Sequence, residues 1–239
     1  MYEELCDVLL NNGVRLIYTT NRFAARTIDT IGQSRPAVHG ELCFNEKIAY
    51  ELALAGSYMG KRTACLLTTE GLYETMDPVM SSAYTGVIGG CLLIAVMETE
   101  EEVTPVGLFS KVPLIVTETY DEFRRACEFG YTISEKYEIP VIIQTKPEAD
   151  ERVEPSGLSV RQSTPNPELR TSNFIKNPDR WAATPKFRYL LHKSLNEKTE
   201  KIREEFERYE GNTRTDGSMT GVITDSRSGL EFYDDDASL

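Results

Sequence analysis

Two short stretches of this sequence combine residue types that suit the binding of an organic cofactor. Glu46 lies in Asn45-Glu46-Lys47, at the beginning of a segment whose apolar residues have helical spacing. Thr69-Glu70-Gly71-Leu72 directly follows a short apolar strand and begins a second helical segment. A carboxylate in the first turn of one helix, beside a glycine-bearing turn from strand to helix, is a candidate cofactor cradle. The helix macrodipole alone also favours such a carboxylate, by about 0.3–1 kcal/mol, so the spacing leaves both explanations open.

The elements that must position these residues alternate along the first 145 residues. Helical spacing predicts helices at 3–12, 22–32, 45–59, 73–84 and 120–136, and apolar runs predict extended segments at 14–18, 36–39, 64–67, 91–97, 112–117 and 140–145. Near-continuous apolar strands that alternate with helices are typical of an α/β fold, a doubly wound, mostly parallel sheet with helices on both faces. Ligands bind such sheets at the carboxyl ends of the strands. Glu46 and 69–71 both follow a strand, so we expect them at that edge.

The composition of the chain narrows the function classes. With 38 acidic and 26 basic residues, the net charge of −12 argues against an extended nucleic-acid surface. The five cysteines are scattered without a Cys-x-x-Cys pair, which indicates small core residues in a reducing compartment. No apolar run reaches the roughly 18 residues of a membrane span, and no apolar segment follows the acidic N-terminus. We therefore expect a soluble cytoplasmic protein with no metal cluster of its own, no nucleic-acid partner and no membrane partner.

The composition changes after Lys146, which predicts three parts. Residues 1–146 form the α/β domain, and the proline-rich stretch 147–185 is a linker. Residues 186–239 hold a charged helix at 187–209, one strand at 221–224 and an acidic tail, and are interpreted as the start of a truncated second domain.

Glycines mark two further stretches. Gly56–Lys61 has the look of a phosphate-binding loop, but its spacing is one residue short, Arg62 replaces the Ser/Thr, and the stretch ends a helix instead of beginning one. Gly86, Gly89 and Gly90 precede an apolar strand. They either serve backbone geometry or leave room for a neighbouring subunit.

A set of motifs occurs in one order along most of residues 40–225. The motifs are Asn45-Glu46-Lys47 with Glu51, Gly71-Leu72, Asp77-Pro78 with Met80, Ala83-Tyr84-Thr85-Gly86-Val87 with Gly89-Gly90, Ser134-Glu135-Lys136-Tyr137 with Ile139-Pro140-Val141, Phe174-Ile175-Lys176-Asn177-Pro178-Asp179-Arg180-Trp181, and Gly221-Val222-Ile223-Thr224. In this order they resemble the pyrimidine-binding domain of thiamine-diphosphate enzymes. Within that class, the stretch is most similar to the alpha subunit of indolepyruvate ferredoxin oxidoreductase, and residues 174–181 and 221–224 resemble that subunit's linker and next-domain start.

The resemblance implies a cofactor and a role for particular residues. In this family a glutamate hydrogen-bonds the aminopyrimidine ring and activates thiamine diphosphate for attack on a 2-oxo acid. The matching residue here is Glu46, as the catalytic and cofactor-binding carboxylate. Thr69, Glu70 and Gly71 would line the cofactor's ring side, and Tyr84 is also carried over as a cofactor-binding residue.

The resemblance also implies partners. The Gly-Asp-Gly motif and the following Asn that hold the diphosphate and magnesium are absent from this sequence, as are iron–sulfur cysteine motifs. The cofactor would therefore be shared with a partner chain that carries the diphosphate-binding domain and holds the magnesium. We expect a homodimer or hetero-oligomer that passes electrons to ferredoxin indirectly, in a complex that acts on an indolepyruvate-like 2-oxo acid.

Three positions depart from the family pattern and keep other functions open. Tyr18–Phe23 stands where the family has a glycine- and proline-rich loop, Thr69-Glu70 stands where it has a basic residue and histidine, and Glu98–Glu102 replaces a longer polar loop. One alternative is a non-catalytic relative that keeps the fold and regulates or dimerises with a partner. A weaker alternative is a subunit of a non-oxidative 2-oxoacid decarboxylase, against which the match at 178–181 argues.

Overall fold

The computed structural model describes residues 2–34, 37–97, 103–146, 177–181 and 184–212. Residues Met1–Tyr209 form one compact unit, and Glu210–Leu239 cluster separately. The predicted strand at 221–224 and the acidic stretch 98–102 lie outside the described residues. The division into domain, linker and second-domain start stays a prediction, since most of the linker is also outside them.

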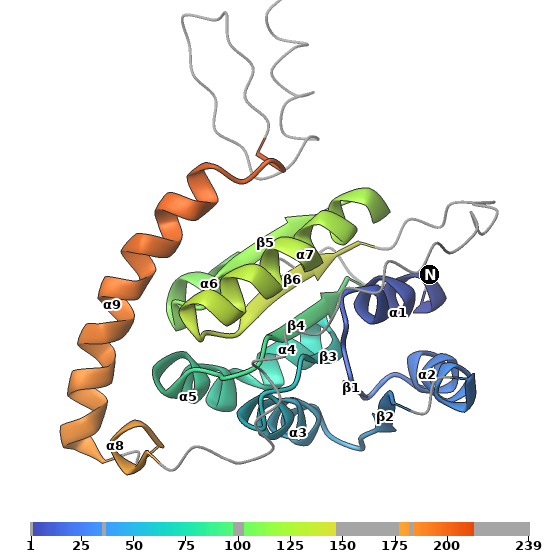
Figure 1. Ribbon diagram of the computed structural model, residues 1–239, viewed down its shortest axis with the longest axis horizontal. Helices are drawn as coiled ribbons and strands as arrows, with labels where there is room; N and C mark the ends of the chain where they lie inside the picture. Colours follow the sequence, from blue (N-terminus) through green and yellow to red (C-terminus); the bar gives the residue numbers. More distant parts are fainter. Residues whose placement is uncertain (1, 35–36, 98–102, 147–176, 182–183, 213–239) are drawn as a thin grey trace, which may run out of the picture. The chain divides into compact units, whose positions relative to one another are not determined.

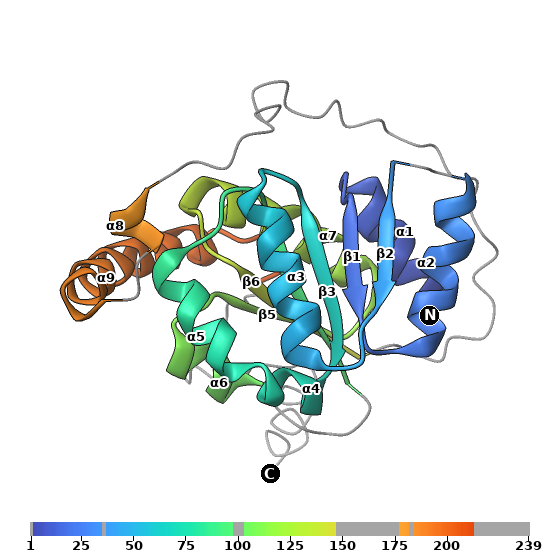
Figure 2. The same ribbon diagram turned by 90° about the horizontal axis from the view of Figure 1, so that it is seen from below.

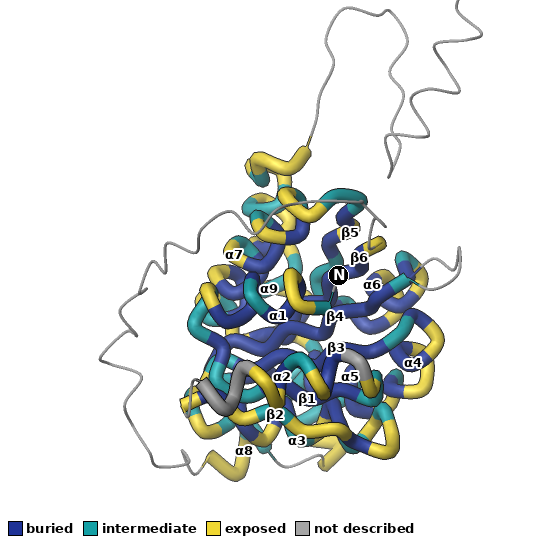
Figure 3. The backbone as a smooth tube through the Cα atoms, turned by 90° about the vertical axis from the view of Figure 1, so that its right-hand side faces the viewer, coloured by how far each residue is buried: buried dark blue, intermediate teal, exposed yellow. Residues whose placement is uncertain are grey.

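A six-stranded sheet organises the unit, with the strand order β2-β1-β3-β4-β6-β5 (Figures 1 and 2). All five pairings are parallel, so the predicted doubly wound parallel sheet is confirmed. Figure 3 shows the central strands β3 and β4 buried along their length, as their continuous apolar sequence predicts. The strands are β1 Leu16–Thr19, β2 His39–Leu42, β3 Thr63–Thr68, β4 Cys91–Val96, β5 Leu114–Thr117 and β6 Val141–Thr145.

Helices cover both faces of the sheet. Figure 2 shows α3 and α5 in front of the sheet and α1 and α7 behind it. The helices are α1 Tyr2–Asn11, α2 Arg22–Ser34, α3 Glu46–Tyr58, α4 Thr69–Glu74, α5 Met76–Thr85, α6 Thr104–Ser110, α7 Tyr120–Tyr137, α8 Pro178–Trp181 and α9 Pro185–Glu207. This arrangement buries one stripe of each helix against the sheet and leaves the carboxyl ends of the strands at a single edge.

The structure differs from the predicted elements at four places. The extended segment predicted at 36–39 is instead β2 at His39–Leu42, and the helix predicted at 73–84 is divided into α4 and α5 at Thr75. The Thr75 hydroxyl is buried and donates to the Leu72 carbonyl oxygen at 2.7 Å, which closes α4. Two helices were not predicted, α6 and α8, and α8 lies within the stretch predicted to be a linker.

Helix α9 packs against α5 and α7 within the same compact unit as the sheet. Its Leu195 and Ile202 side chains are buried. Near the end of α9, the rings of Phe206 and Tyr209 lie 5.2 and 4.5 Å from the ring of Phe129 on α7. Apolar side chains of this charged helix therefore cover part of the domain.

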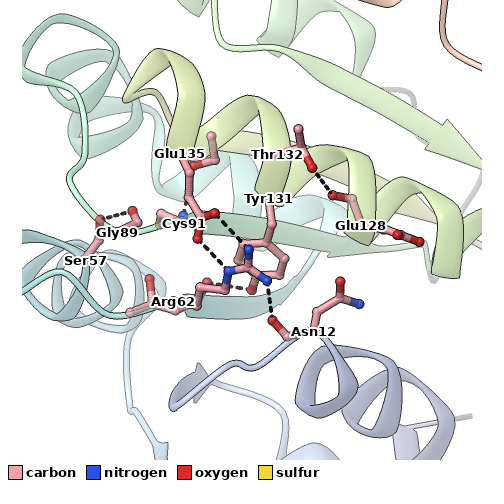
Figure 4. Close-up of polar contacts among 11 residues, drawn as sticks. Asn12, Ser57, Arg62, Gly89, Cys91, Glu128, Tyr131, Thr132 and Glu135 are labelled. Atoms are coloured by element: carbon pink, nitrogen blue, oxygen red, sulfur yellow. Dashed lines mark hydrogen bonds and ion pairs between the residues drawn. The ribbon is translucent and has the colours of Figure 1, made fainter. Parts of the chain in front are cut away.

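A polar network fixes the amino edge of the sheet, opposite the strands' carboxyl ends (Figure 4). The Arg62 guanidinium donates to both carboxylate oxygens of Glu135, at 2.5 and 2.8 Å, and to the Asn12 carbonyl oxygen at 2.6 Å. Tyr131, below that guanidinium, donates its hydroxyl to the Thr63 carbonyl oxygen at 2.9 Å. A bidentate arginine–carboxylate pair is geometrically specific, so it fixes how α7 lies against the beginning of β3.

The glycines before β4 serve backbone geometry in this chain. A Cβ on Gly89 would lie 2.3 Å from the Lys61 carbonyl oxygen, and one on Gly90 would lie 2.5 Å from the Tyr131 ring. Gly86 has a positive φ of 73°, which favours glycine. The chain's own packing therefore accounts for these glycines without a neighbouring subunit.

Candidate functional site

The two stretches singled out in the sequence meet at the carboxyl edge of the sheet. Helix α3 begins at Glu46 shortly after β2 ends, and α4 begins at Thr69 directly after β3 ends. Figure 2 shows both helix beginnings at the lower edge of the view. Asn45 caps α3, since its side chain accepts from the Ile48 backbone N–H at 3.3 Å. The cap makes Glu46 the first helical residue and fixes where its side chain leaves the backbone.

A buried hydrogen bond holds α3 in place beside α5. The Tyr50 hydroxyl lies 2.8 Å from the Ser82 hydroxyl, and the Tyr50 side chain is fully buried. On the surface, Lys47 and Asp77 form a 3.7 Å ion pair between the same two helices. The helix that carries Glu46 is therefore anchored one turn from the site by a buried contact.

Glu46 lies directly against the backbone of Gly71. A Cβ added to Gly71 would lie 2.9 Å from Glu46 Cγ and 3.2 Å from Thr68 Oγ1. No real Cβ tolerates the first of these distances, so only glycine lets the Glu46 side chain lie across the first turn of α4. The Glu46 side chain is half-buried. Burial raises the pKa of the Cys65 thiol in β3, and the charge of the nearby Glu46 carboxylate raises it further.

Thr69 contributes a buried hydroxyl with no partner. The residue is 1% exposed, and its Oγ1 has no hydrogen-bond partner among the described residues. A buried polar atom without a partner costs about 1–3 kcal/mol, so such atoms call for an explanation. One chemical explanation is a ligand that supplies the missing hydrogen bond at this edge.

The other two predicted site residues stand apart from Glu46. Glu70 is exposed on the outer side of α4. Tyr84 lies at the far end of α5, where its hydroxyl is 3.2 Å from His192 Nδ1 and its ring is 5.6 Å from the His192 ring. The structure thus brings together Glu46, Thr69 and Gly71, and it does not bring Tyr84 to them.

The turn after β1 is closed by its own hydrogen bonds. The Thr19 hydroxyl accepts from the Asn21 backbone N–H at 3.0 Å, and the Asn21 side chain accepts from the Ala24 N–H at 3.1 Å. The Asn21 amide also donates to the Tyr2 hydroxyl at 2.8 Å. These residues cap α2, so this turn offers a ligand less open backbone than a glycine-rich loop would.

The sequence reasoning missed the apolar residues that surround this edge. Phe44 is 90% exposed and directly precedes Asn45, and Leu108 and Phe109 of α6 are 77% and 72% exposed. The signal in the sequence was the large apolar residue Phe44 directly before the helix cap, although single exposed apolar residues are common on protein surfaces and indicate no function by themselves. Helix α6 packs beside α5, so its two residues lie next to the helices of the site.

Within the part of the chain that the structure describes, no three His, Cys, Asp or Glu side chains gather so as to hold a metal ion. In the same residues, no helix combines the length and apolar character needed to cross a bilayer.

Comparison with solved structures defines the class of this fold. The chain superposes on 2-oxoglutarate:ferredoxin oxidoreductase from Magnetococcus marinus, solved with 2-oxoglutarate, coenzyme A and succinyl-CoA bound, with a TM-score of 0.57. The match covers 85% of this chain and 44% of that chain at 13% identity, so it establishes the α/β fold alone. No protein-family model matches the sequence.

Curated relatives then identify the particular similarity. The chain is 30% identical over 181 residues to indolepyruvate oxidoreductase subunit IorA of Pyrococcus abyssi and 25% identical over 209 residues to the same subunit of Archaeoglobus fulgidus. These alignments cover 72% and 82% of this chain but only 28% and 33% of the relatives. The resemblance predicted from the motifs is thereby confirmed, and the chain spans about a third or less of each relative's length.

Proposed function

We propose that this chain is a subunit of a 2-oxoacid:ferredoxin oxidoreductase and supplies the pyrimidine half of a split thiamine-diphosphate site. The observation that carries the proposal is the Glu46 side chain held across Gly71 at the carboxyl edge of the parallel sheet. Similarity to the IorA subunits supports the same class of enzyme.

The residues at this edge fit the pyrimidine ring of the cofactor. Gly71 leaves the space that Glu46 needs, and the Thr69 hydroxyl is a buried hydrogen-bonding atom without a partner among the described residues. In the proposed site, a Glu46 carboxyl oxygen holds the proton that it shares with a pyrimidine nitrogen, and Thr69 Oγ1 orients the ring. Bound thiamine diphosphate supplies the carbanion chemistry that 2-oxo acid decarboxylation needs. Roles for Glu70 and Tyr84 at the cofactor stay predictions that this geometry does not favour.

The proposal includes a partner chain. This chain covers 28% of the Pyrococcus abyssi relative, and its sequence lacks the Gly-Asp-Gly motif expected to hold the diphosphate and magnesium. We infer that another chain carries those groups and the route to ferredoxin, in a homodimer or hetero-oligomer, with an indolepyruvate-like substrate. We also place the complex in a reducing compartment, the cytoplasm, because all five cysteines are buried and unpaired.

The experiment that tests the proposal uses the complex purified from its own cells through a tag on this chain. Partner sequences and bound thiamine diphosphate are determined, and 2-oxo acid-dependent reduction of a ferredoxin or viologen dye is measured. Glu46→Gln is expected to reduce turnover by at least 100-fold with the complex intact, and Glu74→Gln, an exposed carboxylate on α4, to leave it unchanged. Unchanged turnover of Glu46→Gln contradicts the role of Glu46.

The second candidate function is a non-catalytic relative that regulates or pairs with a partner. The observation in its favour is the closed turn after β1, where Thr19 and Asn21 use the backbone N–H groups for capping. A partner without the Gly-Asp-Gly motif, and a purified complex without thiamine diphosphate, would select this candidate over the first.

A further inference from the structure

A hollow lies far from Glu46, between α5, α8 and α9. Its volume is about 430 Å³, and Tyr84 and Thr85 at the end of α5 form one of its sides. Helix α5 begins at the carboxyl edge of the sheet and runs back to the amino edge, so this hollow lies at the opposite edge from Glu46. Pockets that hold small organic ligands have volumes of about 300–1,000 Å³.

One wall of the hollow is apolar. Phe187, Leu190 and Leu191 of α9 line it together with Tyr84 of α5. Leu190 is 54% exposed although it lies on a helix that uses Leu195 and Ile202 to cover the domain. The His192 contact described above holds the Tyr84 hydroxyl, so the ring is fixed as part of the wall. An apolar ligand group would thus find a preformed surface here.

The floor of the hollow carries Lys198, a cation without a close ion pair among the described residues. Lys198 Nζ donates to the Glu138 carbonyl oxygen at 3.3 Å. Among the described residues no carboxylate lies within ion-pair distance of it. Burial, together with the neighbouring Arg180, lowers the pKa of Lys198. The Glu138 carboxylate, which is paired with Arg180, acts in the opposite direction on Lys198. A half-buried ammonium whose pKa is lowered by its surroundings is stabilised by an incoming anion.

The second cation of the hollow is Arg180, and each of its three guanidinium nitrogen atoms contacts a protein oxygen. Arg180 Nη1 pairs with a Glu138 carboxylate oxygen at 2.8 Å, and its Nε and Nη2 donate to the Thr85 and Val87 carbonyl oxygens at 2.8 Å each. This fork fixes α8 on the domain and neutralises Glu138. Asp179, the remaining acidic residue of the lining, is exposed. Lys198 is therefore the group left to bind a ligand's charge.

We infer that this hollow binds a small organic carboxylate with an apolar body, its carboxylate at Lys198 Nζ and its body against Leu190, Leu191 and the Tyr84 ring. A single ammonium matches the one charge of a carboxylate better than the nearly two charges of a phosphate group. Glu46, Thr69 and Gly71 do not line the hollow, so the test of this inference is independent of the proposed cofactor site.

Calorimetric titration of the purified chain with phenylacetate tests the inference, with benzyl alcohol as the uncharged analogue and inorganic phosphate as the anion without an apolar body. Phenylacetate is expected to bind at least tenfold more tightly than either, a difference of about 1.4 kcal/mol. Absence of phenylacetate binding up to 10 mM, or equal binding of benzyl alcohol or phosphate, overturns the inference.

Two variants assign the binding to the hollow. Lys198→Met keeps the length of the side chain without its charge, and is expected to weaken phenylacetate binding at least tenfold. Lys193→Met, an exposed position on the same helix that does not line the hollow, should bind phenylacetate as the unaltered chain does. Leu190 is exposed, so Leu190→Ser provides a second test of phenylacetate binding in the hollow if Lys198→Met fails to fold. Binding that none of these variants changes places the ligand elsewhere and contradicts the inference.

Discussion

The Glu46 side chain crosses the Gly71 backbone so closely that a methyl group on Gly71 would lie 2.9 Å from Glu46 Cγ. The two residues come from different helices, α3 and α4, which follow different strands of the sheet. Their contact therefore depends on the parallel sheet, which brings the carboxyl ends of β2 and β3 to one edge.

Gly71→Ala is expected to lower the activity of the assembled complex with little loss of stability. The added methyl forces Glu46 into another rotamer, because the side chain moves more easily than the Leu67 and Thr68 atoms on the other sides of Gly71. We expect turnover at least tenfold lower and a change in the free energy of unfolding of about 1 kcal/mol or less. Dye reduction by the complex and denaturant unfolding of the chain measure the two quantities.

The control for Gly71→Ala is a double-mutant cycle with Glu46→Ala. Without Cγ at residue 46 the new methyl meets open space on that side, so any stability cost of Gly71→Ala should disappear in the double variant. An equal stability cost in both backgrounds would locate the strain at Thr68 or Leu67 instead of Glu46.

Thr69→Val and Thr75→Val are expected to change stability in opposite directions. Both threonines are buried, but Thr69 Oγ1 has no partner in the described part of the chain, whereas Thr75 Oγ1 donates to the Leu72 carbonyl oxygen at 2.7 Å. Replacing an unpaired buried hydroxyl by a methyl should stabilise the isolated chain by about 1 kcal/mol. Removing the paired hydroxyl should destabilise it by about 1 kcal/mol.

Denaturant unfolding of the two variants checks the signs, and the thiamine diphosphate content of the complex provides a second readout. In the proposed site, Thr69→Val weakens retention of the cofactor although it stabilises the chain. If Thr69→Val destabilises the chain as Thr75→Val does, then Thr69 has a hydrogen bond in solution and the argument for a ligand at this atom fails.

The sequence located the candidate site through the order of its elements. Continuous apolar strands that alternate with helices required a parallel sheet, and a parallel sheet requires Glu46 and Gly71 to share an edge. The order of the motifs does not say how far from the edge of the sheet a residue lies along its helix. Tyr84 belongs to the same run of motifs, yet it lies eight residues after Met76, where α5 begins, and contacts His192 instead.

Helix α6 was missed for a different reason. It has seven residues, with Pro105 in its first turn and Gly107 in its middle. A Cβ on Gly107 would lie 3.0 Å from Leu114 Cβ, so this glycine is explained by close packing that no local pattern reveals. Leu108 and Phe109 of the same helix are exposed, which removes the apolar periodicity by which helices are found.

The buried cysteines predict a loss of stability in alkaline solution. Burial raises the pKa of Cys91 from 9.0 to about 12, and burial with nearby carboxylates raises that of Cys6 to about 12. Since the unfolded thiols ionise near pH 9 and the folded ones do not, the unfolded state holds fewer protons there. The contribution of these protonated thiols to the free energy of unfolding is therefore fully present below pH 9 and is lost as the pH rises from 9 toward 12. For each such thiol, the loss by pH 10 is about 1.4 kcal/mol.

Unfolding by denaturant at pH 7, 8, 9 and 10, under reducing conditions, measures this loss. Cys91→Ala removes one titrating thiol, so its stability should fall by about 1.4 kcal/mol less than that of the unaltered chain between pH 7 and pH 10. The comparison uses the change with pH within each protein, because the cavity left by the smaller side chain lowers stability equally at every pH. Lysines and tyrosines titrate alike in both proteins and cancel. Parallel stability curves for the two proteins would mean that Cys91 ionises in the folded chain, and hence that it is accessible to water.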